Sequence, residues 1–178
     1  LNQPIDNLFV AYVDADGLVA IEVEQGDLLV GYITSLTSIE LTAPGSILDA
    51  YPGMPGTFVN IHTPFTAIPG NVDLQAGNQI GSAAAPLTVN MRSGELTSLS
   101  QGSTWIHAAC DLDARIVVST AGSVTLSGAG NLNLGSVRAL LGNAVVTATG
   151  SIKDLDSDAL PDVEAITVIL ISQNGSIG

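Results

Sequence analysis

The sequence predicts an all-β protein, a right-handed parallel β-helix (β-solenoid) with coils of about 26 residues. The composition is the first observation behind this prediction: only 4% of the 178 residues are aromatic and 12% charged, while glycine, serine, threonine and aliphatic residues abound. Such a composition favours short strands and tight turns over helices. The second is that apolar and polar residues alternate without a helical stripe. The third is an internal repeat. The right hand follows from the general rule for crossover connections between parallel strands.

The clearest repeat aligns the segment Gly26–Ile47 with the segment Gly130–Ile152, whose starts lie 104 residues apart. A shorter element also recurs, in which two apolar residues precede Gly-Ser and then Ile or Val. Its glycines are spaced by 77, 28 and 25 residues, and they are Gly45, Gly122, Gly150 and Gly175. Both spacings fit multiples of about 26 residues, which suits one coil of a solenoid whose inward side chains stack on those of the next coil.

An antiparallel β-sandwich is the alternative fold, because it too consists of short strands and turns. A sandwich core normally uses more aromatic residues than the seven present here, and its strands need not repeat at a fixed step. We therefore expect residues 1–178 to form a single solenoid segment of a larger protein, with end coils open to further strand pairing. Two departures are expected: a protruding loop over residues 51–69, which holds four of the eight prolines, and an acidic loop over residues 154–162.

The charge balance argues against nucleic acid as a partner. Aspartate and glutamate number 17 against four lysines and arginines, which gives a formal net charge of −13. Binding to DNA or RNA phosphates requires a basic surface that this chain lacks. No apolar run approaches the roughly 18 residues of a membrane-spanning helix, so no transmembrane segment is expected.

Three strings resemble repeats of filamentous-haemagglutinin-like and other giant bacterial surface proteins: IGSAAAPLTV at 80–89, GNLNLGSV at 130–137 and VVTATGSI at 145–152. The resemblance is strongest from about Gly70 to Gly178. It implies an extracellular or cell-surface location and a structural, adhesive stalk whose repeats catalyse nothing. The implied partners are other segments of the same giant chain and cell-surface glycans or proteins.

The densest run of carboxylates suggests a calcium site. Alternating aspartates are typical of loops that wrap Ca²⁺ with oxygen ligands, and the candidate ligands here are Asp154, Asp156, Asp158 and Asp162. Two positions depart from the usual pattern, because Ala159 replaces a turn glycine and Ala165 replaces a bidentate glutamate. A solvated acidic loop between coils is the alternative interpretation.

The proline-rich segment 51–69 also concentrates aromatic residues. Tyr51, Phe58 and Phe65 could stack on a sugar or on a protein partner, because recognition often resides in loops on a rigid scaffold. The alternative is that these rings fold back and cover the flank of the solenoid.

A carbohydrate-binding or carbohydrate-cleaving module is the alternative function. Asp111 and Asp113 occupy alternate positions and would share a face of a strand, as a pair of glycosidase carboxylates requires. Few cations are available to bind acidic sugars, so we expect no enzyme activity. His62, His107 and Cys110 show no zinc-site spacing, and Cys110 is expected to be a small buried apolar residue.

Overall fold

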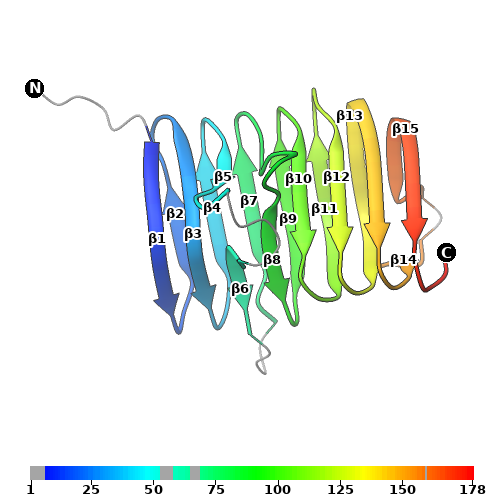
Figure 1. The fold of residues 1–178 in the computed structure, drawn as a ribbon, viewed down its shortest axis with the longest axis horizontal. Coiled ribbons are helices and arrows are strands. Elements are labelled where there is room, and N and C mark those ends of the chain that lie inside the picture. The colour runs from blue at the N-terminus through cyan, green and yellow to red at the C-terminus, as the bar shows by residue number, and fades with distance from the viewer. Residues whose placement is uncertain (1–6, 53–57, 65–68, 159) are drawn as a thin grey trace, which may run out of the picture.

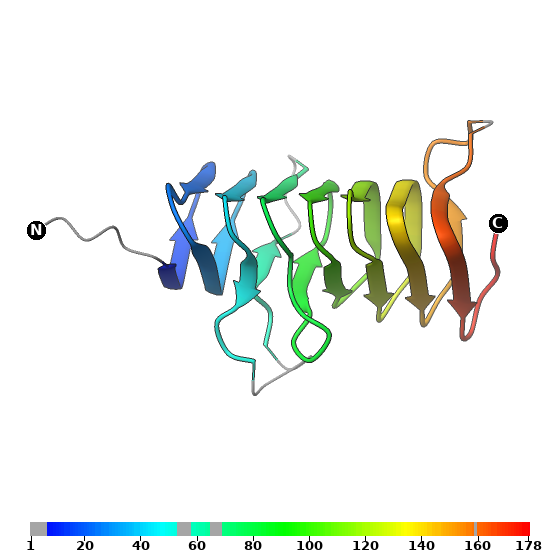
Figure 2. The ribbon, with the colours of Figure 1, turned by 90° about the horizontal axis from the view of Figure 1, so that it is seen from above.

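The computed structural model describes residues 7–52, 58–64, 69–158 and 160–178. Every regular element in these ranges is a β-strand, and all the strand pairs are parallel members of one 15-stranded sheet. The sheet winds into a solenoid of about 8 turns (Figures 1 and 2). The predicted β-solenoid is therefore confirmed, and the sandwich alternative is wrong.

The wall of the solenoid has two faces, which the chain visits in turn. The strand order β1-β3-β6-β8-β10-β12-β13-β11-β9-β7-β4-β2 runs along one face and returns along the other. In Figure 1 the nearer strands run downward as the chain advances from left to right, which is a right-handed winding.

Face A is built from β1 (Asn7–Ala15), β3 (Asp27–Ser35), β5 (Ile47–Asp49), β6 (Ile61–Thr63), β8 (Leu87–Met91), β10 (Thr104–Ala108) and β12 (Val124–Gly128). Face B is built from β2 (Val19–Glu22), β4 (Ile39–Ala43), β7 (Val72–Ala76), β9 (Glu95–Ser100), β11 (Leu112–Ser119) and β14 (Ile152–Asp154). The two longest late strands, β13 (Leu132–Ala148) and β15 (Val163–Ser172), contribute to both faces.

The core consists of aliphatic columns that run along the axis. Alternate residues of each strand point inward, and the parallel register places each one on an inward residue of the next coil. On face B, for example, Ile39 pairs with Val72, which pairs with Leu96, and all three are fully buried. Among the described residues, no buried core residue is aromatic. Small and branched aliphatic side chains are therefore sufficient to fill this narrow interior.

The coil length differs from the prediction: one regular turn takes roughly 20 residues, not 26. Thr104, for example, pairs with Val124, which pairs with Ala144. The prediction was wrong because insertions lengthen the turns from Ile47 to Ile80 and from Ile80 to Thr104. The Gly-Ser element also precedes strands of both faces. The sequence distance between two copies therefore includes an extra half turn whenever the copies precede different faces.

Polar side chains at the corners hold successive coils together. Before face B, the Asp111 carboxylate accepts a hydrogen bond from the Asn131 backbone N–H at 2.8 Å, and the Asn131 side chain accepts one from the Ser151 N–H at 2.8 Å. Before face A, the Asp27 carboxylate accepts a hydrogen bond from the Ser46 backbone N–H. The Ser123 hydroxyl oxygen likewise accepts one from the Asn143 backbone N–H. Each bond satisfies a backbone donor at a bend, where the sheet ladder is interrupted.

The corners also bring backbones into direct contact. A Cβ atom added to Gly77 would overlap the backbone carbonyl of Pro44 in the preceding coil. Gly26 adopts a φ of 78°, which glycine reaches without steric cost. Glycine is thus required at these two bends by close approach and by backbone conformation, respectively.

The predicted loop over 51–69 is interrupted by a wall strand. β6 pairs with β3 and β8, and Ile61 is fully buried in the core. The prediction of one continuous loop was wrong because it relied on the proline content of the segment, which does not reveal a short strand between two insertions. The acidic loop follows β14 and precedes β15, as the sequence indicates.

A buried asparagine closes the first insertion. The Asn60 side-chain amide donates to the Asp49 carboxylate at 2.8 Å and to the Val30 carbonyl at 3.0 Å, and its oxygen accepts the Thr88 backbone N–H at 2.8 Å. Because Asp49 and Asn60 flank the insertion, this network ties both of its ends to the neighbouring coils.

Candidate functional site

Five aromatic residues form one cluster on the outside of face A, in the first three coils. We call it the aromatic surface, and it comprises Phe9, Tyr12, Tyr32, Tyr51 and Phe58. Phe9 and Tyr12 lie on β1, and Tyr32 lies on β3, where it pairs in register with Tyr12. Tyr51 and Phe58 come from the insertion after β5. Leu8, Val10 and Val13 pack against the core, so the alternation shifts phase between Val10 and Val13, and this shift leaves both Phe9 and Tyr12 on the outer side of β1.

The rings support one another. Tyr12 and Tyr32 are stacked with centroids 5.5 Å apart, and Tyr51 meets Phe58 edge to face at 5.2 Å. Tyr51 also contacts Phe9, and Phe58 contacts Tyr32, both edge to face. Such pairs contribute about 0.5–1.5 kcal/mol each beyond the apolar area that they bury. Tyr51 and Phe58 thus lie against the rings of the two strands.

Part of the aromatic surface remains accessible. Tyr12 is 65% exposed, Phe9 51% and Tyr51 38%. The sequence predicted a ligand-binding role for Tyr51, Phe58 and Phe65, and Phe65 lies outside the described residues. It gave no such indication for the other three rings of the aromatic surface, which are Phe9, Tyr12 and Tyr32. The sequence separation of Tyr12 and Tyr32 equals the length of one regular turn, so these two residues lie side by side. The predicted coil length of 26 residues was too long to bring them together.

Polar groups lie at the edge of the rings. A hydrogen bond of 3.3 Å joins Tyr32 Oη to His62 Nδ1, and Tyr12 Oη donates to the Asp14 carboxylate at 3.3 Å. Burial lowers the pKa of His62, and the nearby Arg92 lowers it further. The Asp14 charge raises the pKa of Tyr12. At neutral pH the imidazole and this phenol are therefore uncharged and can both donate and accept hydrogen bonds.

The acidic loop gathers three of the four predicted calcium ligands. Carboxylate oxygens of Asp154, Asp156 and Asp162 all lie within 4.8 Å of one another. Burial raises the pKa of Asp162, and the charges of Asp154, Asp156 and Asp158 raise it further. Mutual repulsion of this kind is relieved when a cation binds between the carboxylates.

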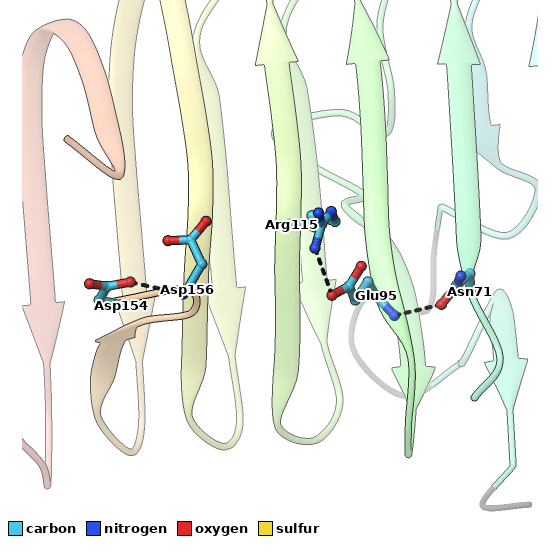
Figure 3. Close-up of polar contacts among 5 residues, drawn as sticks. All are labelled: Asn71, Glu95, Arg115, Asp154 and Asp156. Carbon is cyan, nitrogen blue, oxygen red and sulfur yellow. Dashed lines mark hydrogen bonds and ion pairs between the residues drawn. The ribbon is translucent and has the colours of Figure 1, made fainter. Parts of the chain in front are cut away.

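Asp158 is not a member of that group. Its carboxylate accepts the Leu160 backbone N–H at 2.6 Å. Asp154 shapes the turn in a similar way, because its Oδ1 accepts the N–H of Asp156 at 2.9 Å (Figure 3). The same oxygen accepts the N–H of Ser157 at 2.7 Å. Ala159, which departs from the calcium-loop pattern, lies outside the described residues.

Beside the acidic loop, a surface hollow of about 460 Å³ lies over face B. Arg115 and Arg138 line it, and each is paired with a glutamate: Arg115 Nη1 lies 3.1 Å from Glu95 Oε1, and Arg138 Nη2 lies 2.7 Å from Glu164 Oε2. The Glu95 backbone is held in turn by Asn71 (Figure 3). Both ion pairs are exposed, so that each contributes little to stability.

The carboxylates considered for glycoside cleavage are engaged in contacts between coils. Asp111 caps Asn131 at the corner, and Asp113 Oδ1 accepts the Asn133 side-chain amide at 2.6 Å. His107 shares a hydrogen bond of 2.9 Å with Ser127. The Cys110 thiol is half-buried and donates to the Met91 carbonyl, and burial raises its pKa, so that it remains a thiol.

No family model, no curated protein and no solved structure matches this chain. The likeness to known repeats therefore rests on the strings quoted above and on the solenoid architecture. Within the ranges that the structure describes, no helix has the length and apolar character needed to cross a bilayer.

Proposed function

We propose that this chain is a non-catalytic stalk segment of a large secreted or cell-surface bacterial protein, which holds other parts of that protein apart and contributes to adhesion. The observation that supports this proposal best is the continuous parallel pairing of strands among the described residues, from the first coil to the last. In such an array each coil leans only on its neighbours, so that length can be added without changing the contacts between coils.

Two further features favour a structural role. The corner side chains are committed to hydrogen bonds between coils, Asp111 among them. The surface is acidic, with a formal net charge of −13 over the whole chain, which favours solubility of an extended rod.

The stalk proposal predicts that regular coils can be multiplied. Leu112 and Leu132 occupy the same position in successive turns, so residues 112–131 form one module. Three additional tandem copies of this module should give a folded protein that is longer by about 14 Å, at about 4.8 Å per coil. Small-angle X-ray scattering would measure the maximum dimension, and far-UV circular dichroism would measure the added strand content.

A matched control carries a glycine-serine insert of the same total length at the same junction, and it should add no strand signal. The stalk proposal would be contradicted if the chain with extra coils failed to fold or kept its original maximum dimension.

A calcium-stabilised stalk is a second candidate, favoured by the convergence of Asp154, Asp156 and Asp162. A cation that binds only the folded state raises apparent stability, by about 2.7 kcal/mol at a concentration of 100 Kd. We expect a higher melting temperature in CaCl₂ than in EDTA, measured by circular dichroism. The substitution Asp162→Asn should abolish the difference, and equal melting temperatures of the unmodified chain in both buffers would exclude the site.

A further inference from the structure

We propose that the aromatic surface is a binding site for an uncharged oligosaccharide. The proposal adds a ligand to the stalk and does not depend on its mechanics. It starts from the location of the rings: the described core is entirely aliphatic, whereas five of the seven aromatic residues lie together on the outside of face A. Contiguous exposed patches of large apolar side chains mark interaction sites.

The rings are held in place before any ligand arrives. Tyr12 stacks on Tyr32, and both stand on strands that are locked in the parallel sheet. Edge-to-face contacts then fasten Tyr51 to Phe9 and Phe58 to Tyr32. Binding to such a surface freezes few additional torsions, which lowers the entropy cost of association.

The chemistry at the edge of the rings selects a polyhydroxylated ligand. Sugar hydroxyls need partners that donate and partners that accept hydrogen bonds, while the C–H faces of the sugar rings need an apolar platform. The Asp14 carboxylate accepts, and the Tyr32 phenol and the His62 imidazole can do both.

The charge excludes polyanions as ligands. A chain with a net charge of −13 repels nucleic acids and anionic lipid surfaces. An uncharged saccharide does not meet this obstacle.

The test uses the whole folded chain on an array of neutral and acidic oligosaccharides, followed by isothermal titration with the best neutral one. We expect binding to neutral glycans that persists in about 1 M salt, because little of it is electrostatic. Tyr12→Ala should weaken the affinity about tenfold or more, as truncation of an exposed aromatic anchor does. Tyr12→Phe, which keeps the stacked ring, should lose less.

Leu141→Ala is the matched control, because Leu141 is 68% exposed on β13, far along the chain from these rings. It should leave the affinity unchanged, and circular dichroism would show that all variants fold alike. The proposal is overturned if no neutral glycan binds, if Tyr12→Ala and Phe9→Ala bind like the unmodified chain, or if only acidic glycans or quaternary ammonium compounds bind. None of these results would affect the lengthening expected for extra coils.

Discussion

Replacing Asn60 by alanine is expected to cost about 3 kcal/mol of unfolding free energy, because each buried polar group left without a partner costs about 1–3 kcal/mol. The side chain is fully buried and serves three coils at once. Its loss leaves the Thr88 N–H without its acceptor and removes a donor from the buried Asp49 carboxylate. Urea unfolding followed by circular dichroism would measure the change.

Asn174→Ala provides the matched control for this substitution, since Asn174 is exposed at the last corner. Its effect should stay within about 0.5 kcal/mol. If the two variants unfolded at the same urea concentration, the buried amide would not be the tie between the insertion and the wall. The Asn60 variant should also loosen Tyr51 and Phe58, which the same insertion carries.

Leu74→Ala is expected to destabilise the chain by about 2–5 kcal/mol, the cost of a cavity left by a truncated core leucine. Leu74 is fully buried in β7, where it stacks between Leu41 and Ser98 of the adjacent coils. Because each coil contacts only its neighbours, a defect in a middle coil weakens the coupling between the two halves of the array. The midpoint of urea unfolding would decrease accordingly.

Gln75→Ala tests the same strand on its outer side. Gln75 follows Leu74 directly and is exposed, so its truncation should change the unfolding free energy by no more than about 0.5 kcal/mol. Equal effects of the two substitutions would mean that the alternation of inward and outward positions along β7 is not what holds this coil.

The aromatic surface shows where reasoning from sequence stops. Tyr51 and Phe58 are close in the chain, in a segment rich in proline and aromatic residues, and this composition led to the prediction of ligand binding. Phe9, Tyr12 and Tyr32 join them only because the register places coils one, two and three side by side. A correct register requires the turn length, which insertions after β5 and before β7 and β15 obscure.

The acidic loop was easier to identify because its aspartates are neighbours in the chain. Even so, only the folded loop separates Asp158, which caps Leu160, from the three carboxylates that converge. For Asp111, sequence alternation suggested a catalytic carboxylate, whereas the coil stacked beside it supplies the backbone N–H that this side chain accepts.

By itself, the sequence determined that the chain is an all-β solenoid, since alternation, glycine bends and repetition are local properties that any coil displays. Only the tertiary structure decided the 20-residue turn, the wall strand within the first insertion and the gathering of five rings on one face. The physical reason is that these features depend on which residues lie one coil apart. That distance is set by the closing of each turn on the one beneath it, not by spacing along the chain.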